Sequence, residues 1–214
     1  MSEADEPPTF PAPGILAGPS VALVPLEEEH REPLREAAKL DENIWTYFPR
    51  TFNGAGADFD PWFDRARSLQ RAGEHYPFAV VRQADGRILG TTRFYDMAPI
   101  HRRLAIGSTW YVPEARGSLV NAEVRWLSLS HAFDAWQVNR VELITDPRNL
   151  ASRAAMKLLG AVQEGVIRHH LIYKDGRVRD SALFSILREE WPAVSERLIA
   201  TVGPALAHHR THRK

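Results

Sequence analysis

The sequence contains no cysteine among its 214 residues. Disulfide bonds, a thiol nucleophile and thiolate metal ligands are therefore excluded together, and the composition fits a reducing compartment. Long apolar runs are missing too, since none approaches the roughly 18 residues of a membrane-crossing helix. The acidic, proline-rich start MSEADEPPTFPAPG has neither the basic segment nor the apolar core of a signal peptide. We therefore expect a cytoplasmic protein without a membrane partner.

An excess of charge of either sign is also missing, because 27 basic side chains balance 27 acidic ones. That balance argues against a nucleic-acid partner, and only the basic run HHRTHRK at residues 208–214 favours one. No metal is expected either. His169 and His170 are adjacent, so they would face opposite sides of a strand, and the last histidines lie in the basic tail.

The residues that are present, 44% hydrophobic and 25% charged, are typical of a globular protein. Residues 1–19 contain five prolines, which we interpret as a flexible or extended arm. Residues 20–201 contain no linker or repeat and predict one mixed α/β domain, followed by a basic tail at 202–214. Either a monomer or a homodimer fits this organisation.

The segment 104–136 carries the clearest pattern. Apolar and aromatic residues predict a strand over 104–112, which Pro113 ends because proline has no N–H for a ladder. A helix follows, indicated by apolar residues spaced by three, four and three: Trp126, Leu129, Phe133 and Trp136. The turn between them is basic and contains glycine. Its unpaired amides would lie at the positive end of a helix dipole, where phosphates bind.

The remaining elements flank this unit. Helices are expected at 27–40, 58–71, 149–159 and 189–201, and strands at 20–26, 77–82, 87–95, 140–145, 166–173 and 181–187. Strand 20–26 is interpreted as an edge strand. Asp85-Gly86 and Asp175-Gly176 predict hairpin turns.

This order of elements resembles the GNAT superfamily of acyl-CoA-dependent N-acetyltransferases, and most closely its Rim-type branch, which acetylates the N-termini of ribosomal proteins. The likeness covers roughly residues 20–192 and is carried by IGSTWYVPEARGSLVNAEV, TDPRNLASRAAMKLLGAVQEGVIRHH and DGRVRDSALFSILREEWP. It implies acetyl-CoA as cosubstrate, an amine acceptor and no metal. It also implies a mostly antiparallel sheet flanked by helices, in which strands 104–112 and 140–145 splay apart.

In such enzymes the pantetheine arm lies between the splayed strands, and a backbone N–H of the first strand meets the thioester oxygen, where negative charge develops. The resemblance places this donor among Trp110, Tyr111 and Val112, without a choice between them. The pyrophosphate would rest on the amides from Arg116 to Ala122, with Arg116 supplying charge. The residues between those two are Gly117, Ser118, Leu119, Val120 and Asn121. An ordinary surface turn is the alternative.

Leu119 departs from the family pattern, which often has glycine at this position. A leucine held at positive φ would cost about 1–2 kcal/mol. Either the turn is shifted, with Gly117 as its flexible residue, or cofactor binding is weak.

The resemblance also assigns Asn149, Ser152 and Arg153 to the cofactor, and Asn149 is in addition a candidate helix cap. Many family members carry a tyrosine acid seven residues after this asparagine, where this chain has Met156. Ser152 is then the candidate for protonating the leaving thiolate. Its alternative role is a first-turn hydroxyl bonded to the backbone.

No general base stands out. Glu74, His75, His101 and Glu123 are candidates, each equally explained as a surface group, and water is an alternative to all of them. His131 lies among apolar residues and is predicted to be a core histidine.

The acceptor is expected near an aromatic loop and the adjoining strand, at Trp45, Tyr47, Arg93 and Tyr95. Core packing is the alternative role for these aromatics. The expected function is acetyl transfer from acetyl-CoA to a primary amine, on a protein N-terminus or a small molecule, by direct attack. The alternative is a non-catalytic acyl-CoA-binding or regulatory module.

Overall fold

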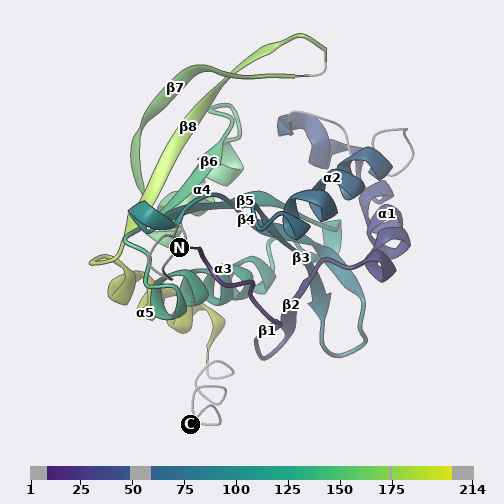
Figure 1. Cartoon of the computed structure of the whole chain (residues 1–214), viewed down its shortest axis with the longest axis horizontal. Helices are drawn as coiled ribbons and strands as arrows, with labels where there is room; N and C mark the ends of the chain where they lie inside the picture. The colour runs from purple at the N-terminus through teal and green to yellow at the C-terminus, as the bar shows by residue number, and fades with distance from the viewer. Residues whose placement is uncertain (1–8, 49–58, 174, 204–214) are drawn as a thin grey trace, which may run out of the picture.

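One sheet organises the molecule. The computed structural model describes residues 9–48, 59–173 and 175–203. Within them, eight strands follow the order β1-β2-β3-β4-β5-β6-β8-β7, and only the β5–β6 pair is parallel (Figure 1). In chain order, β1 to β8 span Leu16–Ala17, Val21–Pro25, Tyr76–Arg82, Ile88–Ala98, Arg103–Tyr111, Arg140–Thr145, Val162–Ile172 and Val178–Leu187. The predicted fold class, a mixed and mostly antiparallel sheet, is confirmed.

Helices cover both faces of this sheet. α1 (Arg31–Lys39) and α2 (Phe59–Arg71) contact β4 and β3 on one side, while α3 (Val120–Ser130) and α5 (Trp191–Val202) pack together on the other (Figure 1). α4 (Leu150–Leu159) contacts β6, β7 and α5. Short helical turns join the elements: η1 (Glu28–His30), η2 (Glu42–Tyr47), η3 (Pro99–His101) and η4 (Pro113–Ala115). No helix in the described ranges combines the length and apolar composition that crossing a bilayer requires.

The helix predicted from the spacing of Trp126, Leu129, Phe133 and Trp136 is not a single α-helix. After Ser130 it continues as a π-helical turn, η5, over His131–Ala135. The His131 ring lies 4.5 Å from the ring of Trp136 and 6.0 Å from that of Phe94. His131 is therefore half-buried against aromatic residues of the core, in agreement with a packing role.

The parallel strands β5 and β6 pair over only a short length. Their register joins Arg103 to Arg140 and continues only as far as Ala105 and Glu142. β5 runs on to Tyr111 without β6 beside it, so the two strands diverge toward the cofactor side expected from the sequence.

A bulge bends β5 at the same place. Arg93 pairs with Gly107 and Thr91 with Trp110, so two residues of β5 lie opposite one residue of β4. Ser108, inside the bulge, has a φ of 48°. Such a conformation is unfavourable for a non-glycine residue and recurs where a strand re-aims its groups beside a site.

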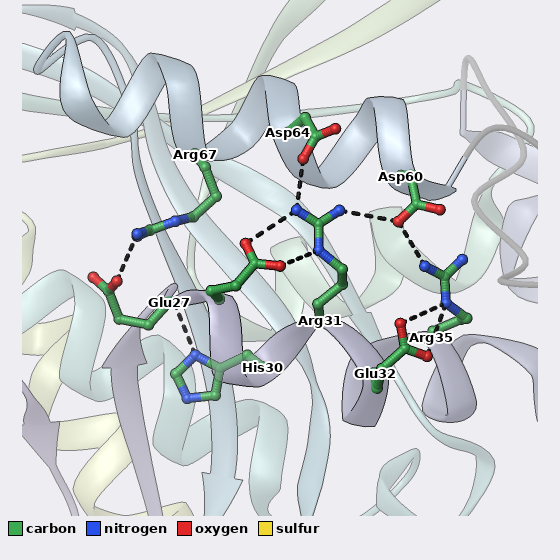
Figure 2. Close-up of polar contacts among 9 residues, drawn as sticks. Glu27, His30, Arg31, Glu32, Arg35, Asp60, Asp64 and Arg67 are labelled. Atoms are coloured by element: carbon green, nitrogen blue, oxygen red, sulfur yellow. Dashed lines mark hydrogen bonds and ion pairs between the residues drawn. The ribbon is translucent and has the colours of Figure 1, made fainter.

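Ion pairs join α1 to α2 (Figure 2). Arg31 contacts Asp60 at 2.9 Å and Asp64 at 2.6 Å, and Arg35 contacts Asp60 at 2.6 Å. The two guanidinium groups lie over aromatic rings of α2, namely Phe63 and Phe59, at 4.3 and 4.6 Å from the ring centroids. Exposed ion pairs contribute little singly, so these contacts and the ring stacking add to the burial of Leu34 and Ala38, which fixes α1 against the core.

The N-terminal arm predicted over 1–19 is wrong for residues 9–19, which belong to the domain. Phe10 is buried and stacks on Trp136 at 5.0 Å, and its carbonyl oxygen accepts a hydrogen bond from Tyr76 Oη at 2.8 Å. β1 then pairs with β2 and takes the edge position expected for β2. Aromatic burial outweighs the extended preference of the prolines here. Residues 1–8 and the tail beyond 203 lie outside the described residues.

Candidate active site

A cavity of about 480 Å³ opens where β5 leaves β6, bordered by η2, the first turns of α3 and α4, and α5. Nine residues predicted from the sequence line it: Tyr47, Trp110, Tyr111, Arg116, Gly117, Asn121, Ala122, Asn149 and Ser152. Segments far apart in the sequence therefore meet at one site. Val112, Ser118, Leu119, Val120, Arg153, Trp45, Arg93 and Tyr95 were also predicted but do not line the cavity.

The turn before α3 is shaped by Gly117, not by Leu119. Gly117 has a φ of 69°, whereas Leu119 has φ −70° and ψ −10°, the ordinary right-handed region, and its side chain is exposed. The turn is therefore shifted, one of the two outcomes expected. Leu119 carries no strain, and its side chain lies outside the cavity.

Several backbone amides of this turn are left without a hydrogen-bond acceptor by the residues that the structure describes. The amides of Gly117, Ser118, Leu119, Asn121 and Ala122 have no hydrogen-bond acceptor within the described residues. Val120 is the exception, since its amide donates to the Ser118 hydroxyl at 3.2 Å. Unpaired donors at the start of an eleven-residue helix, beside the cavity, form a site suited to an anion.

Arg116 is already engaged by the protein. Its Nε donates to the Tyr111 carbonyl oxygen at 3.0 Å, and its Nη1 lies 2.5 Å from Asp41 Oδ2. The hydrogen bond from Arg116 lowers the pKa of Asp41. Arg116 thus braces η2 against the end of β5, so its charge is partly neutralised before any phosphate arrives.

Of the three candidate oxyanion donors, the amide of Val112 is excluded. Its amide donates to the Leu89 carbonyl oxygen at 2.8 Å, so it faces β4 and is satisfied there. Successive amides of a strand point to opposite sides, which turns the Tyr111 amide away from β4 and toward the gap left by β6. The Trp110 amide faces β4 like that of Val112. The Trp110 ring lies 5.4 Å from that of Trp45.

The start of α4 contributes Asn149 and Ser152. Asn149 Oδ1 accepts a hydrogen bond from the Ser152 amide at 3.0 Å, which confirms the predicted helix cap, and both residues line the cavity. Met156 lines it one turn further on. Arg153 does not, because its Nη1 donates to the Pro147 carbonyl oxygen at 3.0 Å and holds the side chain against the preceding loop.

The predicted acceptor residues separate in the structure. Tyr47 lines the cavity, whereas Trp45 is buried, which fits the core-packing alternative given for it. Tyr95 packs where a Cβ on Gly107 would stand, 3.0 Å from its ring. Burial raises the pKa of Tyr95 to about 12 and lowers that of Arg93 to about 10. Arg93 lies over the Trp62 ring at 5.9 Å and Tyr95 lies near the His75 ring at 6.1 Å, so both pack away from the cavity lining.

The general-base candidates do not reach the cavity. Glu123 is fully buried and accepts hydrogen bonds from the Ser20 and Val21 amides at 2.8 and 3.0 Å, so it fixes the β1–β2 turn to α3. Burial lowers the pKa of His75 to about 4, too low for a useful base at neutral pH. Glu74 and His101 are exposed. Among the described lining residues there is no Asp, Glu or His.

Several lining residues were not predicted from the sequence, and Arg125 and Arg197 are the charged ones among them. Arg125 lies one turn after Asn121 on α3, and its Nη1 is enclosed without an acceptor. Burial lowers the pKa of this guanidinium. Its neighbours Val124, Trp126 and Leu127 are apolar, but α3 also contains Asn121, Glu123 and two serines, so no local signal singles out Arg125.

Comparisons with known proteins agree with this geometry. A family model described as an acetyltransferase (GNAT) domain matches residues 20–162. The Bacillus subtilis (strain 168) protein named "Putative ribosomal N-acetyltransferase YdaF" is 31% identical over 108 residues, 50% of this chain and 57% of that protein. YoaA of the same strain, named an uncharacterized N-acetyltransferase, is 28% identical over 111 residues, 52% of this chain and 62% of its own. The matches thus cover less than two thirds of these curated relatives.

Solved structures match over a larger share of the chain. A GCN5-related N-acetyltransferase from Brucella melitensis is 30% identical with a TM-score of 0.84, covering 94% of this chain and 90% of that one. Mycobacterium smegmatis RimJ, in complex with CoA-disulfide, is 26% identical with a TM-score of 0.73, covering 87% and 91%. The chain therefore belongs to the GNAT acetyltransferase domain family, and its relatives place it with the Rim-like branch.

Proposed function

We propose that this chain is an acetyl-CoA-dependent N-acetyltransferase that acts on primary amines. The observation that carries the proposal is the divergence of β5 from β6 directly beside the free amides before α3. A neutral pantetheine arm fits the gap between strands, and a pyrophosphate fits the amides of Gly117 to Ala122. Membership of the family supports this choice of cosubstrate.

The reaction would proceed by direct attack of the amine on the thioester carbon. The carbonyl oxygen gains negative charge as the new C–N bond forms, and the Tyr111 amide is placed to donate to it. The C–S bond then breaks, and the thiolate takes a proton, for which we propose the Ser152 hydroxyl, since it lines the cavity from the first turn of α4. A thiol with a pKa of about 8.5 leaves readily, so a weak acid suffices where Met156 replaces the usual tyrosine.

The acceptor amine has to lose a proton to water, because the described lining offers no carboxylate or imidazole. An α-amine has a pKa near 8 and a lysine side chain one near 10.4, so the lysine costs about 3–4 kcal/mol more to deprotonate at neutral pH. A site without a base therefore favours protein N-termini, or small amines of low pKa, over lysine side chains. The name of one curated relative, a putative ribosomal N-acetyltransferase, supports a protein as the acceptor.

The alternative is a non-catalytic acyl-CoA-binding module. Met156 favours it, because the position of the usual acid carries a thioether. Leu119 no longer does, since the turn accommodates it without strain.

Incubation of the protein with acetyl-CoA and a panel of peptides, lysine derivatives and small amines tests the proposal. We expect free thiol to appear in step with a mass increase of one acetyl group on the acceptor, fastest for N-terminal α-amines. Ser152→Ala would lower the single-turnover rate, with Ser130→Ala as a matched serine on α3 outside the cavity. Acetyl-CoA binding without turnover on any amine would contradict the proposal and favour the module.

A further inference from the structure

Arg125 is a cation at the cavity wall, and none of the residues that the structure describes places an anion beside it. Its side chain lines the cavity, and its Nη1 is enclosed without an acceptor. Within the described residues no carboxylate lies within ion-pair distance of it. Arginine keeps its proton even when buried, so the positive charge persists there.

Such a group is costly unless something pairs with it. Arg125 is only partly exposed, and a guanidinium partly withdrawn from water is stabilised most strongly by an anion that pairs with it. The other charged residues in the described lining of the cavity are Arg116 and Arg197, which are both basic. Of these, Arg116 already forms an ion pair with Asp41. The field in this cavity therefore favours a negatively charged occupant close to Arg125.

Arg125 lies deeper in the cavity than the amides expected to bind the phosphates of the cosubstrate, so the anion that pairs with it is a different group. The free amides end at Ala122, and Arg125 lies three residues further along α3, about 4–5 Å deeper at 1.5 Å per residue. Its charge interacts with Tyr111 and Tyr95, on the strands that border the reacting centre. The pantetheine arm expected there is neutral, so the anion has to come from the acceptor.

We propose that Arg125 selects acceptors that carry a carboxylate close to the reacting amine, such as peptides with an acidic residue at the first or second position. This inference rests on the proposed function and names the substrate class of the same site. Arg125 holds the carboxylate by charge and hydrogen bonds, which positions the amine beside the thioester at Tyr111.

Steady-state kinetics with two peptides test this proposal, one beginning serine-aspartate and the other serine-asparagine. They differ only in charge at the second residue. We expect wild-type kcat/KM to be at least tenfold higher for the aspartate peptide, mainly through KM. Arg125→Gln should bring the ratio close to one, and Arg125→Lys should retain part of it. Arg71→Gln, which removes an exposed arginine from the end of α2, should leave the ratio unchanged.

Three results would overturn the inference while leaving acetyl transfer intact. The wild type could show no preference, or the ratio could survive Arg125→Gln. Alternatively, Arg125→Gln could lower kcat equally for both peptides, which would assign Arg125 to the thioester or the thiolate. Calorimetry with acetyl-CoA adds a further check, since a tenfold loss of affinity with an unchanged ratio would assign Arg125 to the cosubstrate. If the wild type acetylates no amine at all, the proposed function fails together with the inference.

Discussion

Arg116 bridges the carbonyl oxygen of Tyr111 and the carboxylate of Asp41, at 3.0 and 2.5 Å. These two contacts tie η2, which carries Tyr47, to the end of β5. Because Tyr111 is also the proposed oxyanion donor, the same bridge sets the position of the donor and one wall of the cavity.

The geometry of this bridge predicts that charge alone cannot replace Arg116. A lysine has no planar fork with which to hold both acceptors. We therefore expect Arg116→Lys to weaken acetyl-CoA binding five- to tenfold, nearly as much as Arg116→Met, in calorimetric titrations. Full affinity in the lysine variant would show that Arg116 acts only as a phosphate charge.

The conformation of the phosphate turn predicts opposite results at two neighbouring positions. Leu119→Gly should not tighten acetyl-CoA binding, because Leu119 already has a relaxed right-handed backbone. Gly117→Ala should weaken it, since a Cβ at a φ of 69° costs about 1–2 kcal/mol even though the surrounding space is open. Calorimetry on both variants checks this pair. Tighter binding by Leu119→Gly would contradict the shifted turn.

Glu123 is predicted to act on stability and not on chemistry. Glu123→Ala leaves the Ser20 and Val21 amides unpaired in a buried position, at a cost of about 3 kcal/mol. The melting temperature should then fall by about 6–12 °C. Glu123→Gln keeps an oxygen for these amides and should stay close to wild type in both stability and kcat. A loss of kcat in a folded Glu123→Gln would instead identify Glu123 as the base.

Asp146 makes stability depend on pH. Its side chain is buried; burial acts to raise its pKa, but hydrogen bonds from Arg148 and Tyr173 outweigh this and lower the pKa to about 2. A carboxyl with a lowered folded pKa stabilises the fold above its unfolded pKa of about 3.9, and that contribution is lost as pH falls toward 2. It amounts to about 2 kcal/mol at pH 7.

Asp146→Asn should therefore destabilise the protein at pH 7 in urea titrations, and the gap to wild type should narrow by about 1 kcal/mol at pH 3. Asp175→Asn is the matched control, since Asp175 is exposed in the β7–β8 turn and asparagine suits that turn equally. A gap that does not change with pH would show that Asp146 is not ionised in the folded protein at pH 3.

Local patterns in the sequence were enough to predict most helices and strands. Asn149 and Gly160 predicted the two ends of α4, because caps depend on a residue's own backbone and its nearest neighbours. The pattern of apolar residues likewise predicted β5, and with the resemblance it placed the cofactor turn after it. Nine of the predicted site residues meet in one cavity as a result.

Features that depend on distant partners were not predictable in this way. Phe10 is buried because it stacks on Trp136, which is distant in the sequence. Glu123 has a structural role because it accepts a hydrogen bond from Ser20, which lies 103 positions before it. In the sequence Arg125 is an ordinary charged residue of a helix, and only the fold places it in the cavity lining near Tyr111. Nothing local distinguishes such a residue from a solvated one.

A crystal structure with bound CoA or acetyl-CoA tests the central claim most directly. We predict that the pantetheine arm lies between β5 and β6 with the pyrophosphate on the amides of Gly117 to Ala122. The thioester oxygen of acetyl-CoA should lie about 3 Å from the Tyr111 amide nitrogen. A cosubstrate bound outside this gap, or a thioester oxygen out of reach of that amide, would contradict the account.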